Sequence, residues 1–515
     1  MKSYKQRLAD RLDSALRSLF PEAERREFVE TDEGFFCDYA LDQPLRPDSF
    51  AALGQALAQT PADCAFALDR FSGAYAHGDA SEEMLQRVSV LAFASREQLD
   101  AYQRRAAEAA AHDHKALGAQ LGLYSSAGEI GQGLILWHPA GAMLRVQIER
   151  FGQQAHLLND YQWVYTPHIG RASLWERSGH LDFYRDSMYS PIEIDGEAYY
   201  LKPMSCPFHI EIYNSVPRSY RELPMRLAEY ATVYRYELSG TLNGLTRVRG
   251  FTQDDAHIIC TEQQMESEVA GALRFSLYML RAFGFETFEA YVSTKPEKKC
   301  IGDDAQWERA TTVLKAAVRA AGLTYQIDEG GGAFYGPKID LKLRDSLGRA
   351  WQCSTIQFDF NLPARFAMRY VGGDGRRHTP YMVHRALFGS LERFTALLIE
   401  HYNGAFPLWL SPVQMGVVPV RPEHNEYAHT IARRCKQADY RVKVDDEDTN
   451  LRSKIKAFQR QKLPLLLVVG DREQERGTVS VRSREAGDLG EMTLERLAAY
   501  IRPELERGIP QCILE

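Results

Sequence analysis

The chain has 515 residues, of which 45% are hydrophobic and 25% charged, and its formal net charge at pH 7 is -7. This length predicts about two to four globular domains. No run of about 18 apolar residues occurs, so no membrane-spanning helix is predicted. The net charge argues against nonspecific nucleic-acid binding by bulk charge, although a local basic face could still bind RNA. The eight cysteines lack paired spacing and are predicted to be free thiols.

Residues 1–82 are predicted to form a small α+β domain. Its first 20 residues, MKSYKQRLADRLDSALRSLF, have the pattern of an amphipathic helix and include Asp10 and Asp13. Signal peptides need an apolar centre and transit peptides avoid acids, so we interpret this stretch as folded structure and expect a cytoplasmic protein. Residues 83–122 are rich in alanine with charged residues between, which predicts one long connecting helix that acts as a solvated spacer.

Residues 123–411 contain runs typical of strands, including AYYLKP, ATVYRYEL, GPKIDLKLRD and RAWQCSTIQFDF, with a helix predicted near 262–283. Their hairpin-like spacing predicts an antiparallel sheet flanked by helices, in an α+β domain of catalytic size. Residues 412–515 change to alternating strands and helices, which predicts a small α/β domain with a mostly parallel sheet.

The stretch 247–260, RVRGFTQDDAHIIC, is predicted to be a strand that carries Gln253, Asp255 and His257 on one face, because side chains two residues apart share a face. An amide, a carboxylate and an imidazole together suit a small polar ligand or a metal. This stretch alone leaves open the alternative that the polar face is only solvated.

The helix predicted at 451–461 has an apolar stripe of Leu451, Ile455 and Phe458. Basic residues occupy its remaining faces: Arg452, Lys454, Lys456, Arg460 and Lys462. Such a pattern is compatible with RNA binding and equally with a solvated helix face.

Three segments resemble the signatures of class II aminoacyl-tRNA synthetases, and within that class the threonyl-tRNA synthetase family. They are a helix and strand ending at Pro167, the segment Arg235-Tyr-Glu237 with the strand that follows to Phe251, and GSLERF with Arg393. The similarity covers residues 115–510 almost continuously. It implies a class II antiparallel sheet followed by an anticodon-binding domain, in a homodimer that uses ATP with Mg²⁺ to attach L-threonine to the 3′ end of tRNA(Thr).

The resemblance implies that Arg235 bridges the amino-acid carboxylate and the α-phosphate of ATP, and that Arg393 holds the γ-phosphate. The planar guanidinium fork of arginine suits both tasks. The amino-acid carboxylate itself attacks, so the reaction depends on orientation and charge stabilisation and needs no protein nucleophile. A surface ion pair is the alternative role for either arginine. The remaining implied nucleotide contacts are Glu237, Arg247, Phe251, Gln352 and Thr355.

Cys206, His257 and His384 lie far apart in the sequence, so spacing alone does not join them. In the family the matching positions bind zinc. One Cys and two His leave an open coordination position, which implies a Zn²⁺ that receives the amino group and hydroxyl of threonine, with Asp255 accepting from the hydroxyl. For each histidine alone, a satisfied core position is the alternative. The residues expected to complete the pocket are Met204, Gln253, Tyr335 and Gln357, of which Met204 and Tyr335 fit a core position equally well.

The last domain resembles the family's anticodon-binding domain, with Glu475 and Arg484 at positions that read bases. Asp448 stands where the family usually has Asn, which puts the base preference there in doubt.

At the N-terminus, LFPEAERREF and EGFFCDY resemble the start of the family's editing domain, which hydrolyses mischarged seryl-tRNA. Gln6 and Asp10 occupy the positions of its catalytic histidines, and the segment with its remaining Cys and His is deleted. We therefore expect a truncated remnant without editing activity, and no ubiquitin-like domain before it.

Several residues near the implied active site differ from the family's usual ones: Leu181, Ser205, Phe208, Tyr234, Asn243, Ser354 and Phe366. The implied zinc ligands are present although the residues around them differ, which suggests a divergent second copy. Phe208 and Phe366 would add bulk where an inhibitor would otherwise bind.

Two other functions remain open from the sequence. One is an adenylating enzyme that loads threonine onto a carrier protein, and the other is a non-catalytic RNA-binding relative.

Overall fold

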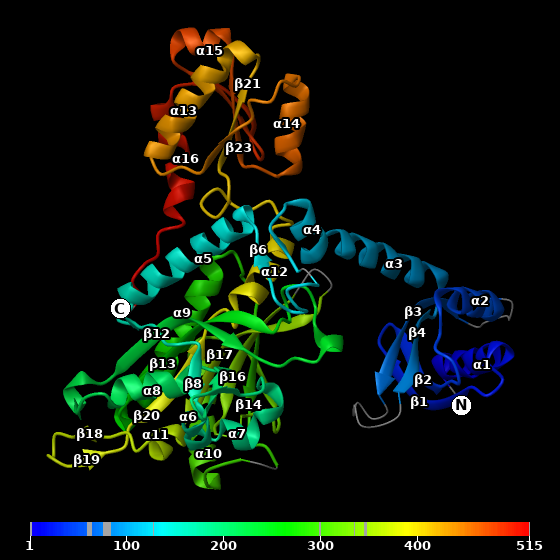
Figure 1. Cartoon of the computed structure of the whole chain (residues 1–515), viewed down its shortest axis with the longest axis vertical. Helices are drawn as coiled ribbons and strands as arrows, with labels where there is room; N and C mark the ends of the chain where they lie inside the picture. Colours follow the sequence, from blue (N-terminus) through cyan, green and yellow to red (C-terminus); the bar gives the residue numbers. More distant parts are fainter. Residues whose placement is uncertain are drawn as a thin grey trace. The chain divides into compact units, whose positions relative to one another are not determined.

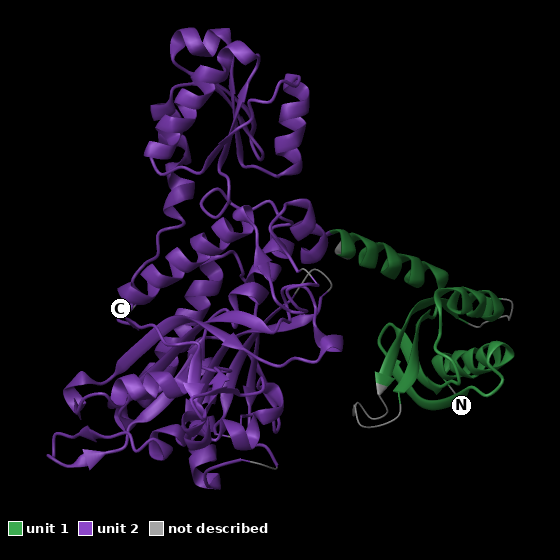
Figure 2. Ribbon diagram, viewed as in Figure 1, with its two compact units in different colours: residues 1–111 green, residues 112–515 purple. Residues whose placement is uncertain are grey.

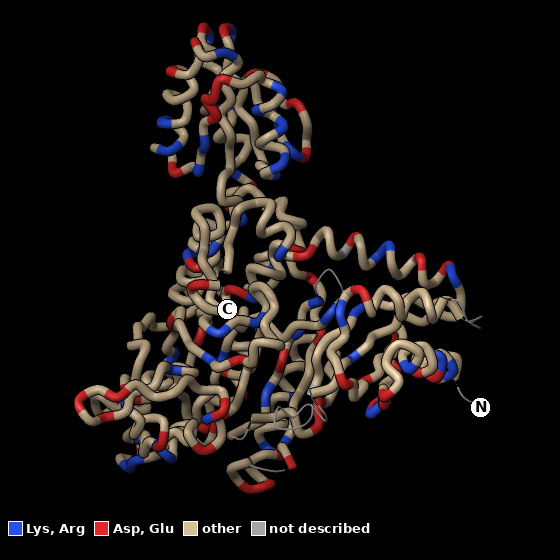
Figure 3. The backbone as a smooth tube through the Cα atoms, turned by 45° about the vertical axis from the view of Figure 1, so that its right-hand side comes forward, with Lys and Arg blue, Asp and Glu red and all other residues tan. Residues whose placement is uncertain are grey.

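The structure is a computed structural model that describes residues 3–58, 64–75, 84–126, 128–297, 300–333, 335–344 and 348–513. The chain forms two compact units, residues 1–111 and 112–515 (Figure 2). Lys and Arg are interspersed with Asp and Glu along both units (Figure 3). Among the described residues, no helix is long and apolar enough to cross a membrane.

Unit 1 is a four-stranded antiparallel sheet in the order β1-β2-β4-β3, with helices packed on it (Figure 1). Leu8 and Leu12 from the first helix and Leu53 from the second share one core with Phe35 and Val88 of the sheet. The elements are α1 Tyr4–Leu19, β1 Glu24–Thr31, β2 Gly34–Ala40, α2 Pro47–Ala58, β3 Ala65–Tyr75, β4 Met84–Phe93 and α3 Arg96–Ala111.

The prediction of one helix over residues 83–122 is wrong. Residues 84–93 form β4, a central strand paired with both β2 and β3. The local sequence explains the strand, because Val88, Val90 and Ala92 are buried at every second position. Helical structure begins only at α3, and a second helix, α4 His114–Gln120, starts where the Asp113 side chain accepts a 2.7 Å hydrogen bond from the backbone N–H of Lys115.

Unit 2 contains an eight-stranded sheet in the order β15-β14-β16-β17-β20-β13-β12-β7. Its ladders are antiparallel except for the two outermost pairs, β14 with β15 and β12 with β7, which are parallel. This confirms the predicted α+β fold with an antiparallel sheet. The strands are β7 Gln162–Trp163, β12 Met225–Tyr234, β13 Gly250–Cys260, β14 Glu289–Ser293, β15 Tyr325–Asp328, β16 Lys338–Arg344, β17 Ala350–Asp359 and β20 Tyr381–Ala386.

Four helices cover one face of this sheet and build the largest core among the described residues. Ile148 and Phe151 of the first helix pack with Leu273 of the second, against Ala256 and Ile258 on the inward face of β13. Because side chains alternate along β13, the residues between these apolar ones project from the opposite face of the sheet. The helices are α5 Pro139–Leu158, α9 Met265–Ala282, α10 Asp304–Ala320 and α12 Leu391–His401.

The opposite face of the sheet is covered at one end by α8 Cys206–Asn214. Ile210 and Tyr213 of α8 are buried against Leu227, Ile259 and Met382 of strands β12, β13 and β20. The helix therefore closes one end of this face. Next to it lies a three-stranded sheet of β8 Ile169–Arg171, β9 Ile192–Ile194 and β10 Glu197–Leu201.

The C-terminal α/β domain has a five-stranded sheet in the order β22-β21-β23-β24-β25. The first two ladders are parallel and the last two antiparallel, so the sheet is mixed rather than mostly parallel as predicted. Only three residues connect β24 to β25, and so short a connection joins antiparallel strands. The strands are β21 Met415–Pro419, β22 Val442–Val444, β23 Leu465–Val469, β24 Val479–Ser483 and β25 Gly487–Met492.

Helices lie on both faces of this smaller sheet (Figure 1). The helix predicted to be basic, α14 Leu451–Arg460, buries Phe458 as expected, but Lys454 is buried as well and donates to the backbone oxygen of Pro419 at 3.4 Å. Lys454 is therefore part of the domain's interior and not of a basic surface. The remaining helices are α13 Asn425–Gln437, α15 Asp471–Arg476 and α16 Leu494–Glu506.

Candidate active site

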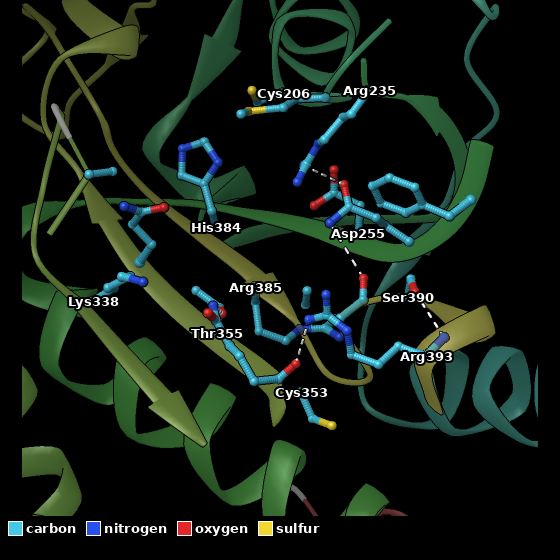
Figure 4. A pocket seen from close by; sticks show the side chains of 18 of the residues that line it. Cys206, Arg235, Asp255, Lys338, Cys353, Thr355, His384, Arg385, Ser390 and Arg393 are labelled. Atoms are coloured by element: carbon cyan, nitrogen blue, oxygen red, sulfur yellow. Dashed lines mark hydrogen bonds between the residues drawn. The ribbon is translucent and has the colours of Figure 1, made fainter. Parts of the chain in front are cut away.

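A cavity of about 690 Å³ opens on the uncovered face of the eight-stranded sheet (Figure 4). Its walls come from β13, β17, β20, the start of α8 and the start of α12. Every residue that the sequence analysis proposed for the catalytic domain lines it: Met204, Cys206, Arg235, Glu237, Arg247, Phe251, Gln253, Asp255, His257, Tyr335, Gln352, Thr355, Gln357, His384 and Arg393. Segments nearly 200 residues apart are thereby brought to one place.

Strand register aligns the central residues of the cavity. His257 on β13 lies directly opposite His384 on β20, which in turn lies opposite Gln357 on β17. Residues paired across neighbouring strands project from the same face, so the three side chains form one row. The predicted shared face of Gln253, Asp255 and His257 on β13 is confirmed, since all three line the cavity.

One end of the cavity holds Cys206, His257 and His384, whose candidate ligand atoms all lie within 4.8 Å of one another. Nε2 of His257 faces Nδ1 of His384 at 3.0 Å. The outer ring nitrogens have other partners. Nε2 of His384 lies 2.8 Å from Oδ2 of Asp359, and Nδ1 of His257 lies 2.8 Å from Nδ1 of His209.

For neutral imidazoles, these contacts assign which ring nitrogens carry hydrogen. A carboxylate only accepts, so Nε2 of His384 donates to Asp359 and its Nδ1 presents a lone pair. His209 likewise donates from Nε2 to Oε1 of Glu229 at 3.2 Å, which leaves its Nδ1 to accept from Nδ1–H of His257. Two lone pairs, on His257 Nε2 and His384 Nδ1, therefore face each other. A cation bound by both would satisfy them, and this is the arrangement that metal-binding histidines favour.

The charges around Cys206 also suit a cation. Burial raises the pKa of the Cys206 thiol well above its ordinary value, and the negative charges of Asp255 and Asp359 raise it further. Burial lowers the pKa of His257 well below its ordinary value, which favours the neutral imidazole. The donor set of one thiol and two imidazoles lacks a positive charge, and a bound metal ion would supply it. The residues present thus fit a zinc-type ion.

The other end of the cavity is lined by arginines. Arg235 donates from Nε to the backbone oxygen of Pro203 at 3.2 Å, and its guanidinium lies 5.1 Å from the ring centroid of Phe251. Arg393, at the start of α12, is held by backbone oxygens of Thr246 and Gln352 at 3.0 and 2.9 Å. Among the described residues neither guanidinium forms an ion pair, so the surface-ion-pair alternative does not describe them.

Sequence reasoning missed several polar residues at this site. Lys338 lines the cavity opposite Gln357 in the register of β16 and β17, and its Nζ lies 2.7 Å from Asp340 Oδ2. His209 and Asp359 hold the outer nitrogens of the two histidines. One pattern could have identified His209, because it follows Cys206 by three residues on α8 and so lies on the same helical face.

The bulky substitutions do not narrow the cavity directly. Phe208 packs edge-on against Trp175, with ring centroids 5.7 Å apart, and Phe366 is buried in the cluster beneath α8 with Ile210 and Tyr213. Neither residue lines the cavity. Their volume lies behind its wall, which is a different position from the one that the sequence suggested.

The two residues proposed to read bases have different environments. Glu475 is exposed on α15. Arg484 instead donates from Nη1 to the backbone oxygen of Lys462 at 2.6 Å and from Nη2 to that of Phe406 at 2.9 Å. Its guanidinium therefore ties the C-terminal domain to the segment that precedes it, a use that its position in the sequence did not indicate.

Comparison with known protein families agrees with this architecture. Residues 189–402 match the family described as tRNA synthetase class II core domain (G, H, P, S and T). Residues 414–504 match the anticodon binding domain. The antiparallel sheet, its arginine-lined cavity and the following α/β domain thus define a class II aminoacyl-tRNA synthetase.

Individual relatives identify the family within this class. The chain is 52% identical to the threonine–tRNA ligase of Sulfurihydrogenibium sp. over 86% of its own length and 68% of the relative's. Identity to the threonine–tRNA ligase of Nitrosococcus oceani is 51%, over 86% and 69%. The solved RNA binding domain of threonyl-tRNA synthetase from Cryptosporidium parvum superposes with a TM-score of 0.74 at 37% identity, over 78% of this chain and 100% of that one. The chain belongs to the threonine–tRNA ligase family.

Proposed function

We propose that this protein activates L-threonine with ATP and transfers it to the 3′ end of tRNA(Thr). The observation that supports this most is the continuity of one cavity, with a metal-type cluster at Cys206, His257 and His384 and cationic side chains at Arg235 and Arg393. An amino acid bound at the cluster would direct its carboxylate toward the arginines, where the α-phosphate of ATP must meet it.

In the adenylation step, a carboxylate oxygen of threonine forms a bond to the α-phosphorus while the bond from that phosphorus to the pyrophosphate oxygen breaks. Negative charge develops on the phosphoryl oxygens, and Arg235 and Arg393 stabilise it. Both guanidiniums are already held by backbone oxygens, so little reorganisation is needed. Mg²⁺ carried with the ATP would neutralise further phosphate charge.

The nucleotide itself would bind between Phe251 and the residues near Arg393. Phe251 offers a ring for stacking on adenine, and Glu237 is held in place by Arg247 at 2.9 Å. Gln352 and Thr355 hydrogen-bond each other at 2.7 Å on the side proposed for the ribose.

We further propose that Cys206, His257 and His384 hold one Zn²⁺ per subunit. When bound, that ion supplies a Lewis-acidic position for the amino group and hydroxyl of threonine. Asp255 would accept a hydrogen bond from the hydroxyl, and Tyr335, which donates to Gln357 at 2.8 Å, would complete the wall with Met204 and Gln253. Valine lacks the hydroxyl and would leave these polar groups unpaired, so strong rejection is expected.

The partners proposed are tRNA(Thr) and a second copy of the chain. The C-terminal domain, with Glu475 on its surface, is the proposed anticodon contact. A homodimer is supported by exposed apolar side chains on α5, where Met143 is 36%, Val146 38% and Leu157 53% exposed. The cytoplasm is the proposed location.

Absence of editing in unit 1 is also a proposal. Residues 1–111 contain a single histidine, His77, which lies outside the described residues. On α1, Asp10 lies 3.4 Å from the guanidinium of Arg25, and Gln6 has no titratable group. These residues offer no imidazole for activating a water on α1.

Two assays test the proposal and its rivals. Threonine-dependent exchange of pyrophosphate into ATP reports adenylation, and transfer of labelled threonine to tRNA reports the second step. Both should occur with this protein. Threonine activation without transfer to tRNA would favour a carrier-loading enzyme, and absence of both activities would favour an RNA-binding relative.

A further inference from the structure

A buried chain of polar side chains leads away from His257. Nδ1 of His257 contacts His209 Nδ1 at 2.8 Å, and Nε2 of His209 contacts Glu229 Oε1 at 3.2 Å. Glu229 also accepts hydrogen bonds from the backbone N–H of Thr166 at 3.0 Å and from its hydroxyl at 2.7 Å. Lys202 donates to the same hydroxyl at 2.7 Å. These contacts account for both oxygens of the Glu229 carboxylate.

We propose that His209 and Glu229 are positioning residues for the metal site, which orient His257 so that its Nε2 presents a lone pair to the ion. The inference rests on the zinc site proposed above. Glu229 accepts two hydrogen bonds from Thr166 and a third from His209 Nε2, so a neutral His209 presents Nδ1 as an acceptor. His257 then donates to it from Nδ1, and Nε2 is left free to bind a metal.

The burial of this chain makes the orientation difficult to change. His209 and His257 are 0% and 1% exposed, and Glu229 is 2% exposed. Rotation of any ring would leave a buried donor or acceptor unpaired, which is unfavourable. The other histidine of the cluster, His384, donates directly to the carboxylate of Asp359. Glu229 thus orients His257 through His209, whereas Asp359 orients His384 without an intervening residue.

A second buried histidine–glutamate pair provides a natural comparison. His114 contacts Glu400 through Nδ1 at 2.8 Å, but its Nε2 accepts from the backbone N–H of Leu245 at 3.2 Å. Both ring nitrogens of His114 are therefore used within the protein, and no lone pair remains for an ion. Although Asp113, His114 and Glu400 are close enough to suggest a metal site, their hydrogen bonds fit a structural pair.

The test measures metal binding by the full-length protein rather than turnover. Metal-free protein is titrated with Co²⁺, whose visible absorption reports its ligands, and Zn²⁺ affinity is measured by competition with a chromophoric chelator. We expect wild type to bind one equivalent and Cys206→Ser to lose the thiolate absorption. His209→Leu should bind roughly 10- to 100-fold more weakly, the usual effect of losing such an orienting partner.

A matched pair of amides separates orientation from packing. The side-chain oxygen in His209→Asn reaches the position of Nδ1 and can accept from His257, whereas the amide in His209→Gln reaches only the position of Nε2. We expect near wild-type affinity for the Asn variant and weakened affinity for the Gln variant. His114→Gln should leave metal affinity unchanged. Thermal unfolding of each metal-free variant separates lost affinity from lost structure.

Three results would overturn the inference alone: wild-type affinity in His209→Leu, equal affinities of the Asn and Gln variants, or an equal loss in His114→Gln. Failure of the wild-type protein to bind metal, or an unchanged Co²⁺ spectrum in Cys206→Ser, would instead overturn the proposed metal site and this inference with it. The two kinds of failure are therefore distinguishable.

Discussion

Arg393 donates from Nη1 to the backbone oxygen of Gln352 at 2.9 Å. Together with the bond from its Nε to Thr246, this contact fixes the guanidinium before any substrate arrives. Arg393 lines the cavity (Figure 4). The backbone thus holds a cation in the place where phosphate charge is proposed to develop, which is the arrangement that makes electrostatic stabilisation effective.

We predict that Arg393→Lys lowers kcat for threonine-dependent pyrophosphate exchange by roughly 100- to 1000-fold. Lysine keeps the charge but loses the fork that contacts two backbone oxygens and would bind a phosphate at the same time. Arg105→Lys, an exposed substitution on α3, is the matched control and should be silent. If Arg393→Lys retained wild-type kcat, the proposed role of the guanidinium would be wrong.

Removal of a proposed metal ligand should abolish activation. Each of the substitutions Cys206→Ser and His384→Ala deletes a donor from a cluster whose ligand atoms lie within 4.8 Å of one another. The remaining donor atoms are then buried without a partner. We expect less than one bound zinc per chain by elemental analysis and no detectable pyrophosphate exchange with threonine. Exchange that persists in metal-free variant protein would contradict the assignment.

The fold of unit 2 was accessible from the sequence because strand runs and signature segments are local patterns. The joining of Cys206, His257 and His384 was not, because it depends on the register of β13 with β20 and on where α8 packs. Family resemblance supplied those residues, and the structure supplied their geometry. The spacing of His209 from Cys206 indicates a shared face of α8, but its contact with His257 on β13 becomes visible only in the structure.

Other misses have equally specific causes. The alanine-rich sequence after residues 84–93 favours one continuous helix, yet the alternation at Val88 and Val90 fits a strand that is buried on one face. The sequence pattern predicts that Lys454 is a surface cation. In the structure its aliphatic stem packs inside the C-terminal domain, and its amino group donates to the backbone oxygen of Pro419. Charge patterns alone do not reveal such buried cations.

Arg484 and Glu475 should respond differently to substitution. Arg484→Ala removes donors to the backbone oxygens of Lys462 and Phe406, and hydrogen bonds from a charged group contribute about 1.5–3 kcal/mol. We therefore predict a lower thermal unfolding midpoint for Arg484→Ala and an unchanged midpoint for Glu475→Ala, which is exposed. Weaker tRNA binding in both variants with no change in either midpoint would favour a purely base-reading role for Arg484.

The protein should sediment as a dimer. Val146 and Leu157 on α5 are apolar and exposed in the single chain, and a second copy would cover them. Val146→Glu should shift the protein toward monomer in analytical ultracentrifugation and lower its exchange activity. An active wild-type monomer at micromolar concentration would remove the dimer proposal.

The enzyme should form seryl-tRNA(Thr) and fail to clear it. Serine keeps the amino group and hydroxyl that the metal site would bind and lacks only a methyl group, so binding alone can reject it by about 1–3 kcal/mol, or roughly 10- to 200-fold. Hydrolysis of the wrong product would need a second site, yet α1 carries Gln6 and Asp10 where catalytic histidines are expected, and Asp10 lies beside Arg25. Preformed seryl-tRNA(Thr) should therefore decay at its spontaneous rate when the protein is added.

The matched control is a threonine–tRNA ligase with an intact editing domain, which should deacylate the same substrate promptly. Rapid deacylation by this chain, lost on deletion of residues 1–111, would show that unit 1 retains an editing activity built from other residues.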